Sequence, residues 1–218
     1  MSLKNTFFNL SCAFDTSNFF KQDWICDGEE RVLQYADGFK KFFNIYKNYS
    51  NYYNNIHIVD NTIKNISELD KRIKNEIPEN ANFVFTQKNN YGKFNKGAGI
   101  LENWHEIEKL TSNYEFIFHF EPRLKLNSGK IFDTFIKERK TTFLSHTIEQ
   151  FKTGFIVFKN VDFKKYLSQR KAEDLCHPYT SLEDDIYHFF KENKKDFTLI
   201  DKSDILWHDS AINSWVEY

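Results

Sequence analysis

Residues 89–100 read Asn-Asn-Tyr-Gly-Lys-Phe-Asn-Lys-Gly-Ala-Gly-Ile, and this stretch decides how we interpret the rest of the chain. It places three of the seven glycines in one loop, between the apolar run Phe83-Val84-Phe85 and an amphipathic segment. Glycine suits backbone that must approach another group closely, and the first amides of a helix attract anions. The pattern therefore predicts a strand, a loop and a helix whose N-terminus, together with Lys96, would hold a phosphate. The alternative is ordinary turn chemistry.

Short apolar runs alternate with helical patterns on both sides of this loop. We expect strands at residues 6–10, 56–59, 83–85, 116–120, 142–144, 155–158, 197–200 and 205–207. We expect helices at residues 32–46, 66–73, 101–110, 131–136, 163–167 and 182–190. Such an alternation predicts an α/β fold with a mainly parallel central sheet flanked by helices, and the C-terminal half is less regular. We expect one domain over residues 1–218, with a nucleotide-binding half (5–125), an acceptor-side half (126–218) and no firm boundary between them.

Composition excludes several classes of protein. Of the 218 residues, 30 are basic and 31 acidic, so the net charge of -1 gives no electrostatic footprint for nucleic acid. No apolar run approaches the roughly 20 residues that cross a bilayer, and no signal peptide is recognisable. We expect a cytoplasmic protein without a transmembrane segment, and peripheral contact with a membrane is compatible with this. The motifs of P-loop phosphotransferases, serine esterases and zinc proteases are missing from the sequence.

Polar residues follow the expected strands at the points where each strand ends. Ligands of open α/β sheets bind beyond the carboxyl ends of the strands, so these residues are candidates for a site. Asp60 and Asn61 follow one strand, and a nucleoside contact and a turn are equally good interpretations. Glu121 and Arg123 follow another strand, where Arg123 offers a fork for phosphate oxygens and Glu121 a ligand for a metal or a hydroxyl. A structural ion pair between the two is the alternative.

Two further candidates lie near the C-terminus. Glu183 and Asp184 open an apolar-periodic segment after Ser181, so they form either the acidic first turn of a capped helix or a general base beside a second carboxylate. His208 follows an apolar run and could cover a diphosphate leaving group.

The order of these pieces resembles the nucleotide-diphospho-sugar transferase fold, the GT-A class of glycosyltransferases, and in particular bacterial and viral enzymes of glycan synthesis. The residues that carry the resemblance are 58–62, 95–97, 114–123 and 181–185. The resemblance implies a Rossmann-like GT-A fold and transfer of a sugar from a nucleotide-diphosphate donor to a hydroxyl of a glycan or lipid-linked glycan acceptor. It implies that Glu183 and Asp184 are catalytic. The donor-binding residues that it and the pattern predict are Asp60, Asn61, Asn95, Lys96, Gly97, Glu121, Arg123 and His208.

The sequence departs from this family at the expected metal site. Members hold Mn²⁺ or Mg²⁺ with an Asp-x-Asp, whereas residues 119–123 read His-Phe-Glu-Pro-Arg here. Either Glu121 holds a divalent ion with the donor phosphates, or Arg123 and Lys96 neutralise the diphosphate directly; we favour the second explanation. Two other functions stay open: a catalytically silent nucleotide- or sugar-binding module of the same fold, and a structural partner protein that uses the aromatic segment 46–53. We expect this segment itself to be a helix end and a loop that pack on the core.

Overall fold

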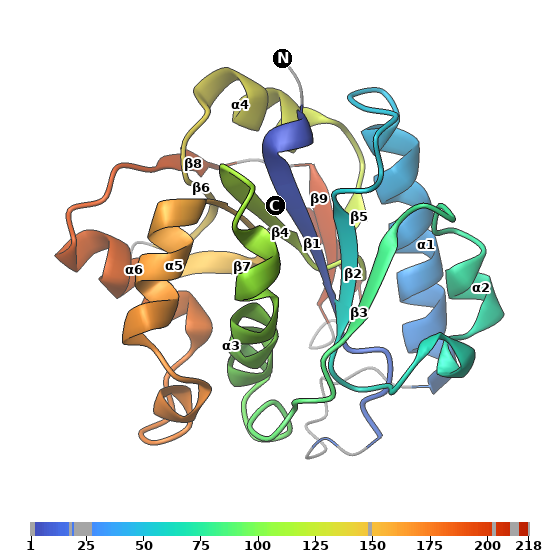
Figure 1. Ribbon diagram of the computed structural model, residues 1–218, viewed down its shortest axis with the longest axis horizontal. Helices are drawn as coiled ribbons and strands as arrows, with labels where there is room; N and C mark the ends of the chain where they lie inside the picture. The colour runs from blue at the N-terminus through green and yellow to red at the C-terminus, as the bar shows by residue number, and fades with distance from the viewer. Residues whose placement is uncertain are drawn as a thin grey trace.

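The computed structural model describes residues 3–17, 19, 28–147, 150–201, 204–209 and 214–217. Its main sheet has the strand order β3-β2-β1-β4-β7-β6-β8 (Figure 1). The strands are β1 (Thr6–Cys12), β2 (Ile56–Asp60), β3 (Asn82–Phe85), β4 (Phe116–Phe120), β6 (Thr142–Thr147), β7 (Gln150–Lys159) and β8 (Thr198–Ile200). A smaller sheet, in the order β10-β9-β5, contains β5 (Lys125–Leu126), β9 (Ile205–Asp209) and β10 (Ser214–Glu217).

The central strands are parallel, as the alternation of strand and helix predicts. β1 pairs in parallel with both β2 and β4, and β2 pairs in parallel with β3. The sheet becomes mixed at β7, which runs antiparallel to β4 and β6. The carboxyl ends of β1 to β4 consequently meet at one edge of the sheet.

Two groups of helices cover the two faces of the sheet. The helices are α1 (Gly28–Tyr46), α2 (Lys71–Lys74), α3 (Lys96–Ile107), α4 (Lys130–Glu138), α5 (Asn160–Gln169) and α6 (Leu182–Glu192). One core joins α1, α2 and α4 to the sheet, and the other joins α3, α5 and α6 to its opposite face. Both faces of β1 and β4 are therefore buried, and in β1 the burial includes the polar residues Thr6, Asn9 and Ser11.

The structure differs from the sequence-based expectation in two places. The helix expected over residues 66–73 is two short pieces, because Asn65 and Asp70 each accept a hydrogen bond from the backbone and start a separate turn. β5 and β10 were not expected. The aromatic segment 46–53 packs largely on the core, as expected, with Tyr46 fully buried and Tyr53 against its ring.

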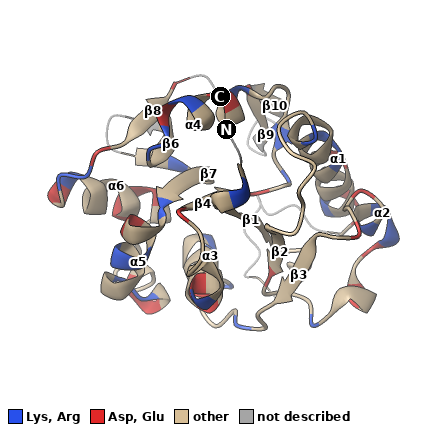
Figure 2. Cartoon of the chain, turned by 45° about the horizontal axis from the view of Figure 1, so that its top comes forward, with Lys and Arg blue, Asp and Glu red and all other residues tan. Residues whose placement is uncertain are grey.

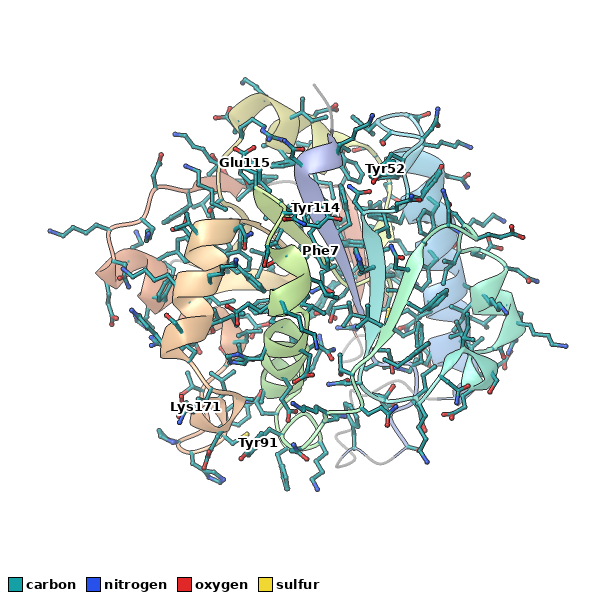
Figure 3. All side chains as sticks on the ribbon, viewed as in Figure 1. Phe7, Tyr52, Tyr91, Tyr114, Glu115 and Lys171 are labelled. Atoms are coloured by element: carbon teal, nitrogen blue, oxygen red, sulfur yellow. The ribbon has the colours of Figure 1, made fainter. Side chains whose placement is uncertain are left out.

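The direction of the strands determines at which end of the molecule a site can lie. Figure 3 shows Tyr91, in the loop after β3, at the opposite end of the molecule from Tyr52 and Glu115, which lie near the beginnings of the strands. The strand ends that carry the candidate residues face the end marked by Tyr91. Acidic and basic residues are interspersed over the helices in Figure 2. None of the helices in the described ranges has both the length and the apolar character to cross a membrane.

Candidate active site

Two cavities meet at a cluster of three charged side chains, Lys96, Glu121 and Arg123, which we call the charged cluster. The first cavity lies at the ends of β1 and β4 beside α1 and α3 and measures about 30 Å³. The second lies beside β7 and α6 and measures about 240 Å³. All three residues of the cluster line both cavities. A ligand that bridges the two cavities would therefore contact these charges.

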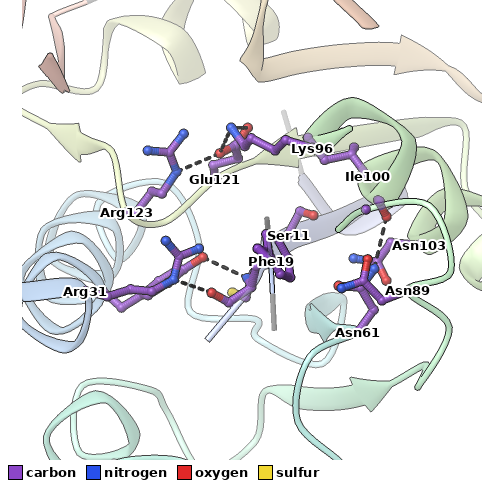
Figure 4. A pocket seen from close by; sticks show the side chains of 15 residues that line it. Ser11, Phe19, Arg31, Asn61, Asn89, Lys96, Ile100, Asn103, Glu121 and Arg123 are labelled. Atoms are coloured by element: carbon purple, nitrogen blue, oxygen red, sulfur yellow. Dashed lines mark hydrogen bonds and ion pairs between the residues drawn. The ribbon is translucent and has the colours of Figure 1, made fainter. Parts of the chain in front are cut away.

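Glu121 holds the charged cluster together. Its carboxylate accepts hydrogen bonds from Lys96 Nζ at 2.8 and 3.0 Å and from Arg123 Nε at 2.9 Å (Figure 4). The Glu121 side chain is 6% exposed, whereas those of Arg123 and Lys96 are 21% and 42% exposed. The ion pair that the sequence left as an alternative for Glu121 and Arg123 is present, and Lys96 joins it from the start of α3.

The charged cluster is ionised and carries a net positive charge. Burial opposes the charge of Glu121, but Lys96 and Arg123 outweigh this effect and hold the pKa of its carboxyl well below the ordinary value. Desolvation, followed by the nearby Arg123, lowers the pKa of Lys96. Two cations thus share one carboxylate, so positive charge exceeds negative charge in the cluster.

A third cation faces the first cavity. Arg31 of α1 is buried, hydrogen-bonds the carbonyl of Ala13 and lies 5.5 Å from the ring of Tyr35. The Tyr35 hydroxyl accepts a hydrogen bond from Ala13 N at 2.8 Å, so both residues of α1 fix the loop after β1. The described wall of this cavity is electropositive, because it contains one acidic residue, Glu121, and three basic residues, Arg31, Lys96 and Arg123. Sequence reasoning missed Arg31, whose only signal was a position in the first turns of a strongly amphipathic helix.

The two adjacent acids of α6, Glu183 and Asp184, make different contacts. Glu183 lines the cavity and accepts a hydrogen bond from the Thr153 hydroxyl at 2.6 Å. Asp184 accepts hydrogen bonds from the Ser181 hydroxyl and from Gln150 Nε2, at 2.5 and 2.7 Å, while Ser181 caps the helix. Asp184 makes the contacts of a capped helix, and Glu183 is the carboxylate that faces the cavity. The catalytic roles of both residues stay predictions. No sequence pattern indicated the cavity residues Thr153 and Trp207.

The glycine-containing segment 89–100 forms hydrogen bonds within the protein. Asn95 caps α3 by accepting from Gly97 N and Ala98 N, and it donates to two backbone carbonyls from its Nδ2. Glu102 accepts from the amides of residues 90 and 91. A Cβ on Gly97 would lie 2.6 Å from Leu182 Cβ, so the missing side chain allows α3 to approach α6. Within this motif, Lys96 is the residue that faces both cavities, and the donor-binding roles of Asn95 and Gly97 stay predictions.

Asp60 and Asn61 also make contacts within the fold. Asp60 is completely buried and accepts hydrogen bonds from the amides of Phe14, Thr62 and Ile63, so that it joins the loops after β1 and β2. Burial raises the pKa of Asp60 against the effect of these hydrogen bonds. Asn61 lines the first cavity while its Nδ2 donates to two carbonyls. Their roles at a nucleoside stay predictions.

His119 lies beneath the charged cluster as a buried, neutral ring. Its Nδ1 accepts a hydrogen bond from Trp104 Nε1 at 3.1 Å and lies 3.1 Å from Asn9 Nδ2. Because the indole nitrogen can only donate, Nδ1 is unprotonated and Nε2 carries the proton. Burial lowers the pKa of His119 to about 4. This geometry is that of a packing residue. His208 is on β9, and its side chain is outside the part that the structure describes.

The described residues do not form a site that fits Mn²⁺ or Mg²⁺. Nowhere in the described ranges do three His, Cys, Asp or Glu side chains come close enough to hold a metal ion. The only candidate ligand from the sequence, Glu121, is already bound by two cations. Divalent ions need several oxygen ligands, and the described walls of the two cavities supply the carboxylates of Glu121 and Glu183, of which the first is already paired with two cations.

Comparison with solved structures places this architecture among known folds. A nucleoside-diphosphate-sugar pyrophosphorylase from Vibrio cholerae RC9 matches with a TM-score of 0.51 at 7% identity, over 92% of this chain and 94% of that chain. A putative protein from Aquifex aeolicus VF5 also matches with a TM-score of 0.51, at 12% identity, over 92% and 88%. The chain therefore shares its α/β fold with these two proteins. Mouse xyloside xylosyltransferase 1 gives a TM-score of 0.48 at 10% identity, over 90% and 84%. No protein-family model and no curated protein sequence matches the chain.

Proposed function

We propose that this protein is a glycosyltransferase that moves a sugar from a nucleotide-diphosphate donor to a hydroxyl of a glycan or lipid-linked glycan acceptor. The observation that carries the proposal is the position of the charged cluster between two cavities. A sugar transferase must stabilise a diphosphate leaving group between a nucleoside and an acceptor. Lys96 and Arg123 supply fixed positive charge where the first and second cavities meet.

Glu183 is the proposed general base. It faces the second cavity together with the charged cluster, so an acceptor hydroxyl in this cavity lies between base and leaving group. Glu183 takes the hydroxyl proton as the oxygen attacks the anomeric carbon of the donor. The bond from that carbon to the diphosphate breaks, and its electron pair goes to the diphosphate oxygen beside Lys96 and Arg123. Such a single displacement inverts the anomeric configuration.

The charged cluster also favours transfer without a divalent ion. Lys96 and Arg123 carry two positive charges against the one negative charge of Glu121, so the cluster offers a diphosphate an excess of positive charge without Mn²⁺ or Mg²⁺. Glu121 pairs with both side chains and so keeps them in place beside a bound diphosphate. The alternative role, in which Glu121 is a metal ligand, requires that it exchange these two ion pairs for a metal.

The test is to incubate the protein with a panel of UDP-, GDP- and CMP-linked sugars in the presence of EDTA. Turnover is measured as release of the nucleotide. We expect one donor to be consumed, and Glu183→Gln to lower kcat by about 10²–10⁴-fold with little change in donor KM. Glu192→Gln, at the exposed opposite end of α6, is the matched control and should not change kcat.

Three results would change the assignment. Loss of turnover in Asp184→Asn but not in Glu183→Gln would move the base to Asp184. Nucleotide binding without turnover would favour the catalytically silent module. Formation of a nucleotide sugar from a nucleoside triphosphate and a sugar 1-phosphate would instead indicate the activity that the Vibrio protein's name describes.

A further inference from the structure

The carboxylate of Glu183 is held by a single described residue, Thr153. Thr153 is 3% exposed, and its hydroxyl donates to Glu183 Oε1 at 2.6 Å. Both residues line the second cavity. A threonine hydroxyl that donates to one carboxylate oxygen fixes the plane of the carboxylate, because a short hydrogen bond to a charged acceptor is strong.

An irregularity in the strand pairing places this threonine. Phe143 of β6 pairs with Ile156 of β7, but the next residue, Leu144, pairs with Lys152. Residues 153–155 fall within this jump in register. Extra residues in one strand form a bulge, which redirects side chains and is common beside active sites. The bulge brings the Thr153 side chain to α6 instead of leaving it in the regular ladder.

The same bulge also contacts the charged cluster. The carbonyl of Gly154 accepts the backbone N–H of Glu121 at 2.9 Å. Two consecutive residues of β7 therefore bind the two acidic residues of the site, one through a side chain and one through the backbone. A Cβ on Gly154 would lie 2.4 Å from Leu124 Cδ1, so glycine permits the close approach of the segment after β4.

We propose that Thr153 is a positioning residue for general-base catalysis, which directs the second oxygen of Glu183 toward an acceptor hydroxyl in the second cavity. This inference rests on the proposed function, since it needs Glu183 to act as a base. The Thr153 hydroxyl does not react. It restricts rotation of the carboxylate, so that the oxygen that takes the proton meets the acceptor in one geometry.

The experiment compares Thr153→Val with Thr153→Ser in the donor-turnover assay. Valine keeps the shape and removes the hydroxyl, so we expect kcat to fall by about tenfold to a hundredfold with donor KM unchanged. Serine keeps the hydroxyl and should restore most of the turnover. Thr142→Val removes another buried strand hydroxyl, whose hydrogen bond goes to the Lys140 carbonyl, and should not change kcat. Thermal melting of each variant shows whether it is folded.

A double-mutant cycle separates positioning from general stability. In a Glu183→Gln background the carboxylate base is gone, so Thr153→Val should have little additional effect on residual turnover. The proposal is overturned if Thr153→Val keeps the wild-type kcat, if serine does not rescue it, or if the loss is equally large in both backgrounds. Absence of turnover in the wild-type protein with every donor would instead contradict the proposed function, and the role of Thr153 would fall with it.

Discussion

At the scale of single residues, the site depends on how burial and charge act on a few side chains. Glu121 is buried and nevertheless ionised, because two cations approach its carboxylate within 3.0 Å. A buried carboxylate with one partner removed is strongly destabilising, so each cation also contributes to folding. Measurements on cluster variants must therefore separate binding from stability.

His119 gives a prediction for the pH dependence of stability. Its pKa is about 4 in the folded protein against an ordinary value of 6.5, so the unfolded chain binds a proton more readily. The contribution of neutral His119 is therefore complete above pH 6.5 and is lost as the pH falls toward 4. The shift corresponds to up to about 3 kcal/mol of unfolding free energy.

Urea unfolding between pH 7 and pH 4.5 measures this effect. In His119→Gln the unfolding free energy should depend less on pH over this interval than in the wild type. Burial also lowers the pKa of His57, so His57→Gln is the comparison that assigns the remaining slope. An unchanged slope in His119→Gln would show that the ring is not buried as described.

At the scale of elements, the cap of α3 serves the fold before any ligand. Asn95 satisfies two amides of α3 and the carbonyls of Leu175 and Thr180 in the segment before α6, and it is 4% exposed. We expect Asn95→Ala to lower the unfolding free energy by about 2–3 kcal/mol in urea denaturation. Asn65→Ala removes an exposed cap of a short turn and should cost about 1 kcal/mol or less.

The same variant tests the donor-binding role predicted for Asn95. If the contacts seen here are its whole role, folded Asn95→Ala will bind nucleotide with the affinity of the wild type. A weaker affinity for nucleotide, measured at a temperature at which the variant is folded, would show that Asn95 contributes to donor binding.

At the scale of the whole molecule, local sequence patterns predicted which helices and strands form better than they predicted which strands pair. The eight expected strands and the amphipathic helices are present, because periodicity reports which face of each segment is buried. The antiparallel direction of β7 and the pairing of β5 with β9 were not predictable, since both depend on contacts between distant segments.

The prediction of site residues from the sequence was limited in the same way. The rule that ligands bind at strand ends selected Asn61, Glu121 and Arg123, which do line the first cavity. Arg31 and Thr153 were missed, because α1 folds over the end of β1 and the bulge in β7 places Thr153 at α6. Neither arrangement leaves a local pattern in the sequence.

The central claim is that Lys96 and Arg123 bind the diphosphate of a nucleotide sugar without a divalent ion. Calorimetric titration with UDP, GDP and CMP, in EDTA and in Mn²⁺, tests it directly. We predict that one nucleoside diphosphate binds in EDTA, and that Lys96→Gln and Arg123→Gln each weaken binding by about tenfold to a hundredfold. Lys137→Gln, whose side chain is 82% exposed, should bind like the wild type. Binding that requires Mn²⁺, or affinity unchanged in both cluster variants, would contradict the account.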